Sequence, residues 1–514
     1  MSFVVEQLNH FRNRTMLSIF LLGIASGFPW VMIGSVMSAW LKDAGLTRSA
    51  IGYFSAVFAV YSINFLWSPL VDRIRLPLLQ ALGQRRGWIL LMQWLMVLGC
   101  LGLSLVDPTQ TLTFAGLTAL AISLSSATQD IVIDAFRIDS IPADQNEQQS
   151  TAAAMATSGW WTGYAGLGAI PFFMADLPGW QWSDIYLLLA GIMALLSIGV
   201  WVANEPKSYR ENVYQQAQSR YLSAISVHKH QATLVLTAII VAIALCITQV
   251  FAPTWFSYQT GAINLVVAGL AILAISNISR MLRQAPAQGP VAAGSTQKAL
   301  AWLLVSLGEP LRDFFNRNGV KVALSLLLFV VLFKMGEAIL GRMSIVFYKE
   351  IGFSNSDIGA YSKLLTWAVT IVASVTGGLL NLRIGIIKGL FVGGIVMAAS
   401  NLLFALMASV GPDKTLLFVT IVVDGFTAAW GTVAFMAFIS VLCNRAFTAS
   451  QYALLASIGT FGRTTLGAYS GVIVDYFDGN WQIFFVLTAL MVLPSLILLY
   501  LIRNKVRAIA GDRA

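Results

Sequence analysis

Long apolar runs, separated by short polar stretches, dominate the chain. Fourteen of these runs reach the length of roughly 20 mostly apolar residues that an α-helix needs to cross a bilayer. They lie at about residues 16–40, 51–71, 88–106, 112–136, 151–174, 184–203, 233–252, 261–280, 321–347, 357–380, 388–410, 415–441, 450–474 and 482–502. The pattern predicts an all-α membrane protein. The even number of spans predicts that both termini lie on the same side of the membrane.

The positively charged residues indicate which side that is. Of the 32 Lys and Arg residues, 24 fall in the predicted loops and termini on the side of the two chain ends, and four fall on the opposite side. In membrane proteins the cytoplasmic loops carry the excess of Lys and Arg. We therefore expect both termini in the cytoplasm. The first apolar run is too long for the core of a signal peptide and is expected to be the first span.

The chain also contains an internal repeat. Residues 41–55 read LKDAGLTRSAIGYFS, and residues 348–362 read YKEIGFSNSDIGAYS, at an offset of 307. Each stretch leaves the first span of one half of the chain and enters the next span. In the same way, GWQ at 179–181, before the sixth span, resembles GNWQ at 479–482, before the last span.

The repeat predicts how the chain is divided. We expect two six-helix halves, an N-terminal half at 1–205 and a C-terminal half at 320–514, that run in the same direction through the membrane. This arrangement resembles the plan of the major facilitator transporters, whose halves are parallel repeats. The central segment, 206–319, carries two extra spans without a charge inside them, so we expect a structural or lipid-facing role for it.

The composition narrows the class of protein further. Hydrophobic residues make up 57% of the chain and charged residues 11%, whereas soluble domains hold about 25% charged residues. The net charge of +9 comes mostly from loops on one side of the membrane, so nucleic acid is not expected as a partner. The three histidines, His10, His228 and His230, all fall in predicted loops. We therefore predict no metal site and no histidine-based catalytic site within the membrane.

Eight ionisable residues nevertheless lie inside the predicted spans. A charge at the centre of a bilayer costs at least ~2.5–3.5 kcal/mol, so such groups face a water-filled cavity or pair within a helix bundle. They are Asp130, Asp134, Lys334, Glu337, Arg342, Lys363, Asp424 and Arg463. These acids and bases, spread over several spans, predict a polar interior that handles a polar or charged solute. That interior points to transport.

Three of the acids are candidates for proton coupling. Asp130 and Asp134 are four residues apart, so they share one face of the fourth span. A carboxylate that loses and regains a proton as access alternates would couple transport to protons. Near Arg137, however, Asp134 is also placed for a structural Asp–Arg pair at the inner face. Glu337, three residues from Lys334, forms either a coupling or anion-binding pair with it or an internal salt bridge.

A second group of residues is expected to contact the solute. Arg463 suits a carboxylate or phosphate, because a guanidinium binds both bidentately, but it is equally placed as a structural partner of Asp424. Neutral polar side chains add hydrogen-bonding groups to the predicted lining. The predicted substrate-binding residues are Asn64, Gln129, Tyr164, Lys334, Lys363, Asp424 and Arg463.

The loop after the second span carries a further cluster of charges. It reads WSPLVDRIRLPLLQALGQRRGW. Asp72-Arg73 followed by Arg85-Arg86 resembles the signature between the second and third helices of major facilitator proteins, where an acid and several bases latch the two halves at the inner face. Together with Arg137, these residues form the predicted cytoplasmic gate.

Several stretches together resemble the AmpG-type muropeptide permeases. They are GIASGFPW (23–30), IGYFSAVFAVYSINFLWSPLVDR (51–73), GQRRGW (83–88), SATQDIVIDAFRIDSIPA (126–143), PLRDFFNRNG (310–319) and LCNRAFTASQYALLASIGTFGR (442–463). The resemblance implies a proton-driven importer in the bacterial inner membrane. Such an importer returns N-acetylglucosaminyl-1,6-anhydro-N-acetylmuramyl peptides to the cytoplasm, and it uses no cofactor beyond the proton motive force. The family's functional Gln-Asp pair maps onto Gln129 and Asp130.

The chain departs from that family's pattern at a few positions. Asn64 stands where a Lys is expected, Glu337 stands where an Asp is usual, and Arg342 has no counterpart. The extra pair of spans lies between the halves, whereas elsewhere in the family it can lie at the C-terminus. These departures concern the ligand range rather than the fold.

We therefore expect a monomeric muropeptide:proton symporter whose partners are its solute, protons and the lipid bilayer. One alternative keeps the fold but carries another polar or anionic solute, such as acetyl-CoA or a sugar conjugate, or exports drugs or lipids. A membrane-embedded acyl- or glycosyltransferase is a third possibility. The lack of histidine within the predicted spans opposes it, so an enzyme is not expected.

Overall fold

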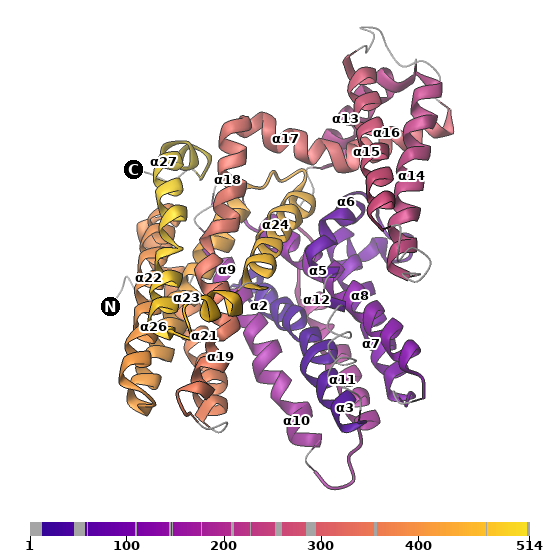
Figure 1. The fold of residues 1–514 in the computed structure, drawn as a ribbon. Helices are drawn as coiled ribbons and strands as arrows, with labels where there is room; N and C mark the ends of the chain where they lie inside the picture. The colour runs from indigo at the N-terminus through magenta and orange to yellow at the C-terminus, as the bar shows by residue number, and fades with distance from the viewer. Residues whose placement is uncertain are drawn as a thin grey trace. The chain divides into compact units, whose positions relative to one another are not determined.

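The computed structural model describes residues 13–45, 57–58, 60–107, 110–142, 145, 148–175, 177–206, 210–226, 228–251, 260–283, 294–353, 357–468 and 470–510. Every regular element within these ranges is a helix (Figure 1). The helices form two compact units, a larger one of Met1–Lys207 with Phe315–Ala514 and a smaller one of Ser208–Phe314. The smaller unit falls within the predicted central segment. The division of the larger unit into two halves stays a prediction.

The helices of the N-terminal half are α2 (Arg14–Gly27), α3 (Met37–Asp43), α5 (Val60–Ile63), α6 (Ser68–Arg73), α7 (Gln84–Ser104), α8 (Leu112–Asp139), α9 (Gln148–Trp161), α10 (Ile170–Ala175), α11 (Trp182–Leu196) and α12 (Ile198–Val202). Short π-helical or 3₁₀ segments connect several of them. These segments are η1 (Val31–Val36), η3 (Asn64–Leu66), η4 (Pro77–Leu82), η5 (Thr162–Gly166) and η6 (Leu167–Ala169).

The predicted C-terminal half also consists of helices with a π-helical segment among them. Its helices are α18 (Val320–Phe333), α19 (Met335–Glu350), α21 (Thr366–Ile384), α22 (Ile386–Val410), α23 (Lys414–Leu442), α24 (Thr448–Ala468), α25 (Ser470–Tyr476), α26 (Trp481–Leu490) and α27 (Leu493–Ala510). The π-helical segment η9 (Ile358–Leu365) precedes α21.

Side chains that accept hydrogen bonds from free backbone N–H groups set where several helices begin. Asn13 accepts a hydrogen bond from the N–H of Met16 at 2.8 Å and starts α2, and Asp413 starts α23 through the N–H of Leu416 at 2.7 Å. Each cap satisfies one of the donors that a helix N-terminus leaves unpaired. Gly385, with φ +83°, separates α21 from α22, because a residue in this left-handed conformation ends a helix.

Fewer helices among the described residues have the length and polarity of a span than the 14 spans that the sequence predicts. Nine helices within the described residues are long and apolar enough to cross a membrane, or ten if a bent pair in the smaller unit is one span. Part of the difference comes from broken helices, because the predicted span at 151–174 is divided among α9, η5, η6 and α10. Part comes from the predicted span at 51–71, which begins outside the described residues. The all-α membrane architecture is confirmed, and the count of 14 stays a prediction.

Glycines bring α2 and α9 into close contact. A Cβ atom on Gly27 would lie 2.0 Å from the carbonyl oxygen of Trp160, and one on Gly163 would lie 2.2 Å from that of Ile24. Small residues at such spacing let helix backbones approach closely in membranes. This close approach joins the first and fifth predicted spans.

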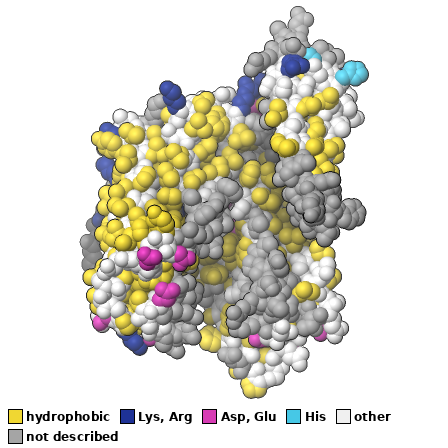
Figure 2. Space-filling view, in the orientation of Figure 1, with side chains coloured by type: hydrophobic (Ala, Val, Ile, Leu, Met, Phe, Trp, Pro, Cys, Tyr) yellow, Lys and Arg dark blue, Asp and Glu magenta, His cyan; other side chains and the backbone are white. Residues whose placement is uncertain are grey.

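The surface of the larger unit is apolar along its sides. Leu98, Leu195 and Ile497 are 59%, 64% and 61% exposed. Figure 2 shows hydrophobic side chains over the flank of this unit, with most of the visible Lys and Arg side chains near one end. This distribution suits helices that stand in lipid with one basic end in water.

The smaller unit is built from α13 (Arg210–Ser226), α14 (Lys229–Phe251), α15 (Thr260–Arg283), α16 (Ser295–Leu303), the π-helical segment η8 (Leu304–Gly308) and the start of α17 (Glu309–Asn318). Glu309 accepts hydrogen bonds from Arg220 and from the hydroxyl of Tyr221, which ties α17 to α13. Gln297 donates to the carbonyl oxygen of Ser226 at 2.8 Å and joins α16 to the same helix.

Candidate functional site

Asp130 lies on α8 where this helix meets α2 and α5. The hydroxyl of Ser26, on α2, donates a hydrogen bond to Asp130 Oδ1 at 2.6 Å. One turn earlier on α8, Ser126 accepts a hydrogen bond from the hydroxyl of Tyr61 at 2.8 Å. Among the described side chains, Asp130 has no cationic partner. Its protonation can therefore change without breaking an ion pair.

Asp134, one turn further along α8, has a different environment. Arg137 Nη2 donates to Asp134 Oδ1 at 3.1 Å, and Arg137 Nη1 donates to the hydroxyl of Ser440, on α23, at 3.0 Å. The Arg137 side chain is 0% exposed, whereas that of Asp134 is 27% exposed. The ion pair considered from the sequence is therefore present. The hydrogen bond from Arg137 to Ser440 also connects α8 to α23 of the predicted C-terminal half.

Two of the predicted substrate-binding residues serve structural contacts in this conformation. Gln129 is fully buried and donates its Nε2–H to the carbonyl oxygen of Ala25 at 2.8 Å. Asn64 accepts a hydrogen bond from the hydroxyl of Ser457, on α24, at 2.9 Å. The structure thus places Gln129 between α8 and α2 and Asn64 between the two halves. Their contact with solute stays a prediction.

A second charged group lies within the C-terminal half. Lys334, at the break between α18 and α19, donates to Glu337 and, at 2.7 Å, to the hydroxyl of Thr432 on α23. The Lys334 side chain is 6% exposed and that of Glu337 is 34% exposed. Asp424, on α23, accepts a hydrogen bond from the hydroxyl of Ser400 at 3.1 Å. The pairing of Lys334 with Glu337 is present, and Glu337 faces accessible space.

Three predicted charges cannot be placed in this arrangement. The backbones of Arg342, Lys363 and Arg463 belong to α19, η9 and α24, but their side chains lie outside the described residues. The pairing suggested between Arg463 and Asp424, and the roles of Lys363 and Arg463 toward an anionic solute, stay predictions.

Tyr164 belongs to an aromatic cluster of the N-terminal half. Its ring stacks on Trp160 at a centroid distance of 5.0 Å, and Trp160 lies 5.9 Å from Trp30. The indole N–H of Trp30 is buried without a hydrogen-bond partner among the described residues. Tyr164 lies in η5, and π-helical turns of this kind occur often at functional sites. The cluster offers flat apolar faces and an unused donor, features that suit a sugar.

Two of the predicted gate residues, Asp72 and Arg85, form a charged latch with Asp139 near the end of α6. Arg85 Nη2 donates to Asp72 Oδ1 at 2.9 Å and to Asp139 Oδ2 at 3.1 Å. The three side chains are 1%, 0% and 3% exposed. A buried guanidinium between two carboxylates satisfies charges that would be costly if left alone. This cluster is called the latch below.

The latch continues into the C-terminal half through the start of α24. Asp72 Oδ2 accepts hydrogen bonds from the backbone N–H of Ser450 at 3.0 Å and from its hydroxyl at 2.8 Å. Asp139 Oδ1 accepts one from the hydroxyl of Thr448 at 2.7 Å. Both carboxylates therefore lie at the positive end of the α24 dipole, and Asp72 satisfies one of its free backbone donors. The latch joins the two halves.

The remaining predicted gate residues surround the latch. Arg86 Nε donates to the carbonyl oxygen of Val200 at 2.8 Å, and Arg73 is the last residue of α6. Glu205 accepts hydrogen bonds from the backbone N–H groups of Arg85 and Arg86 at 2.8 and 3.0 Å, so it caps α7. Sequence reasoning missed Glu205 and Asp139. The sequence signal that could have identified both residues is a single carboxylate at the end of a long apolar run.

Comparison with known proteins identifies the family. The description "Major Facilitator Superfamily" matches residues 19–308, more than half of the chain. The chain belongs to the Major Facilitator Superfamily. It is therefore a transporter rather than an enzyme, and the predicted major facilitator fold is confirmed.

Curated relatives match nearly the whole chain. Putative transporter AmpG 4 of Rickettsia felis is 30% identical over 496 residues, which cover 96% of this chain and 98% of the relative. The anhydromuropeptide permease of Escherichia coli K12 is 27% identical over 488 residues, which cover 95% of this chain and 79% of the relative. The resemblance to AmpG-type permeases is thus confirmed.

Solved structures support the same fold. The proton:xylose symporter XylE aligns with a TM-score of 0.60 at 11% identity, covering 95% of this chain and 94% of its own. The human organic anion transporter MFSD10 aligns with a TM-score of 0.53 at 14% identity, covering 96% of this chain and 99% of its own. At these identities the likeness concerns the fold alone.

Proposed function

We propose that this chain imports cell-wall muropeptides, N-acetylglucosaminyl-1,6-anhydro-N-acetylmuramic acid and its peptides, across the bacterial inner membrane. It works as a monomer with both termini in the cytoplasm, and the two halves give alternating access to a shared solute site. The names of the AmpG relatives and the anhydromuropeptide permease support the choice of solute. The family supports the choice of mechanism.

The observation that carries this proposal is the latch between the halves. Asp72 and Asp139, before residue 205, bind Ser450 and Thr448 at the start of α24. Hydrogen bonds and charge–dipole contacts join these residues, and water can replace each of them when the two sides separate. A rocking motion of the halves can therefore break and remake the latch.

Proton coupling is assigned to Asp130, Asp134 and Glu337. Asp130 can gain or lose a proton without breaking an ion pair, because only Ser26 hydrogen-bonds it among the described residues. Asp134 and Glu337 each hold a buried cation, Arg137 and Lys334, and keep 27% and 34% of their side chains exposed. Protonation of either acid would release its cation toward the solute, which links proton binding to solute binding.

The solute would meet both apolar and charged groups. The rings of Trp30, Trp160 and Tyr164 suit the apolar faces of the disaccharide. Lys334, together with the predicted Lys363 and Arg463, would serve the carboxylates of the peptide, because charge-assisted hydrogen bonds are the strong ones. Asn64 and Gln129 would serve its hydroxyl and amide groups once the halves move apart.

Uptake into proteoliposomes tests this function. Labelled anhydro-muropeptide is offered to vesicles with an acidic outside and a neutral inside, beside protein-free vesicles and vesicles with a collapsed gradient. Accumulation above the outside concentration only with protein and gradient is expected. Equilibration without accumulation would argue against proton coupling. Absence of uptake, with transport of acetyl-CoA or efflux of a dye instead, would favour the alternative carriers.

A further inference from the structure

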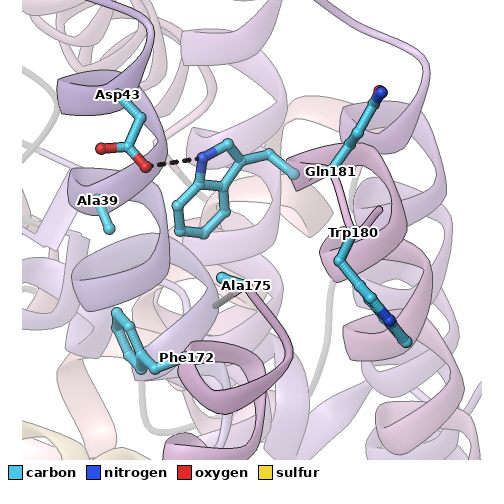
Figure 3. Close-up of a pocket in the computed structure, with 7 residues that line it drawn as sticks. Ala39, Asp43, Phe172, Ala175, Trp180 and Gln181 are labelled. Atoms are coloured by element: carbon cyan, nitrogen blue, oxygen red, sulfur yellow. Dashed lines mark hydrogen bonds between the residues drawn. The ribbon is translucent and has the colours of Figure 1, made fainter. Parts of the chain in front are cut away.

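A cavity outside the transport site lies at the far end of the N-terminal half. It has a volume of about 260 Å³ and is lined by Ala39, Asp43, Phe172, Ala175, Trp180, Gln181 and Trp182 (Figure 3). These residues come from α3, from α10 and from the start of α11 with the segment before it. Figure 1 places α3 and α10 at the end of the larger unit away from α6, which carries Asp72 of the latch.

One hydrogen bond in this cavity has a counterpart in the C-terminal half. Trp182, the first residue of α11, donates its indole N–H to Asp43 Oδ2 at 3.1 Å. Trp481, the first residue of α26, donates its indole N–H to Glu350 Oε2 at 2.8 Å. Asp43 and Glu350 are 307 positions apart, which is the offset of the internal repeat. The same indole–carboxylate bond therefore links the first and last spans of each half.

The two copies of this bond are packed differently. Trp481 is 8% exposed, and its ring lies 5.3, 5.6 and 5.9 Å from those of Phe347, Phe484 and Phe485. Around Trp182 the neighbouring rings of Phe172 and Trp180 are each 37% exposed, and the cavity takes the place of the aromatic packing. A bond that only joined two helices would need no such hollow, as the C-terminal copy shows.

The groups around the hollow suit a carbohydrate. Asp43 Oδ2 is held by Trp182, and Oδ1 has no hydrogen-bond partner among the described residues, so it can accept hydroxyl groups. The amide of Gln181 both donates and accepts. Phe172 and Trp180 contribute aromatic side chains to the lining from different segments (Figure 3). Small-molecule sites combine aromatic walls with a few placed polar groups in this way.

The size of the cavity limits the ligand. Sites for drug-sized ligands measure about 300–1,000 Å³, and this cavity, at about 260 Å³, lies just below that range. It fits one sugar ring but not a disaccharide-peptide. Gly179, with φ +90° in the turn before Trp180, has open space where a side chain would stand, because a Cβ atom there would meet nothing within 4 Å.

We propose that this cavity is an outer subsite that binds one N-acetylhexosamine ring of the solute before the solute enters the transport path. The identity of the sugar rests on the proposed function. Tryptophans near the ends of spans commonly anchor a protein at the membrane surface. An anchor needs the indole ring alone, whereas the subsite also needs the carboxylate of Asp43 and the bond that holds it in place.

Matched substitutions in the two copies separate these roles. Asp43→Asn and Trp182→Phe alter the open copy, and Glu350→Gln and Trp481→Phe make the same chemical changes in the packed copy. Hydrogen bonds to a charged group weaken binding about tenfold when lost, so we expect Asp43→Asn and Trp182→Phe to raise the KM of uptake by about this factor with little change in kcat. The C-terminal pair is expected to leave KM unchanged and to lower Tm.

Calorimetric titration of the detergent-solubilised full-length protein with the peptide-free disaccharide gives an independent measure of binding. Weaker binding by the N-terminal variants only would support the subsite. Unchanged KM and affinity in those variants, or equal losses in both pairs, would overturn it while wild-type uptake leaves the proposed function standing. If the wild type binds the disaccharide through Asp43 but takes up no muropeptide, the subsite holds and the proposed function is wrong.

Discussion

Asp130 and Asp134 share one face of α8 but have different bonding partners. Asp130 accepts a hydrogen bond from Ser26, whereas Asp134 binds Arg137, whose side chain is fully buried. Removing the charge of Asp130 therefore leaves every ion pair intact. Removing that of Asp134 leaves a buried guanidinium without its carboxylate, and breaking a buried pair in this way costs about 3–5 kcal/mol when both partners are buried.

This difference predicts opposite results for two substitutions. Asp130→Asn is expected to abolish gradient-driven accumulation, by at least about tenfold, while solute exchange and Tm stay at wild-type values. Asp134→Asn is expected to lower the free energy of unfolding by about 1–3 kcal/mol, less than the buried-pair value because Asp134 is 27% exposed. Uptake, exchange and thermal unfolding measure the three quantities. Wild-type accumulation by Asp130→Asn would remove this residue from the coupling mechanism.

Residue contacts were predictable from sequence only where they are local. Asp134–Arg137 and Lys334–Glu337 are three positions apart, and the helical repeat alone brings such side chains together. The contact between Asp139 and Thr448 spans 309 positions, and no local pattern encodes it. The same holds for Gln129, which the resemblance placed at the solute but the structure shows bound to the backbone of α2.

At the scale of helices, the contact between α2 and α9 depends on the absence of side chains. The nearest atoms to a Cβ at Gly27 would be the carbonyl group of Trp160, whose oxygen lies 2.0 Å away and belongs to the backbone. A second close contact follows in η5, where a Cβ at Gly163 would lie 2.2 Å from the carbonyl oxygen of Ile24. Gly191, in the middle of α11, has no atom within 4 Å of a Cβ and provides a matched control.

Gly27→Ala and Gly191→Ala are therefore expected to change stability in opposite directions. Overpacking costs about 1–3 kcal/mol or more, so Gly27→Ala should lower the free energy of unfolding by at least this amount. Gly191→Ala should be neutral or stabilising by up to about 1 kcal/mol, because Ala favours a helix. Denaturant unfolding in detergent compares them. Equal effects at the two positions would show that helix propensity, not packing, governs this contact.

The latch joins α6 and α8 to the start of α24, so weakening it should move whole helices. Asp72→Asn removes a charge that faces the α24 dipole and Arg85, and the loss of about 1–2 kcal/mol corresponds to a roughly tenfold shift toward separated halves. Spin labels at Leu78 and Val320, which are 97% and 62% exposed, report the separation. A longer distance in the variant is expected.

The control for the latch is Asp475→Asn, which makes the same change at an exposed residue of α25. It should leave the distance distribution between the labels at its wild-type form. If Asp72→Asn also leaves that distribution unchanged, the latch does not hold the halves together.

Breaks within helices escaped the sequence prediction. Hydropathy indicates one span at 151–174, but the chain forms α9, η5, η6 and α10 there. A π-helical turn changes the hydrogen-bond spacing without changing the average polarity, so an apolar run does not reveal it. The packing of Gly166 against the ring of Trp367, from α21 of the other half, accompanies this break, and only the folded structure brings the two together.

At the scale of the whole molecule, the repeat predicted two related halves but not how they diverge. The indole–carboxylate bond recurs in both, as the matching sequences around residues 43 and 350 suggest. The latch does not recur in this way, because its two carboxylates come from the N-terminal half and the capped helix, α24, comes from the C-terminal half. A carrier with such a contact at one end has an asymmetric arrangement of charges along the axis that the solute follows.

The net charge that moves with the solute determines how the membrane potential acts on transport. If two protons accompany each peptide-free disaccharide, whose lactyl carboxylate carries one negative charge, one positive charge crosses per cycle, and an inside-negative potential of 100 mV contributes about 2.3 kcal/mol. This free energy corresponds to an accumulation of about 50-fold at equal pH on both sides. A potassium diffusion potential set with valinomycin in proteoliposomes provides the test, with Asp130→Asn as the variant that should not accumulate. Equal uptake with and without the potential would show that no net charge moves with the solute, and the two-proton cycle would be wrong.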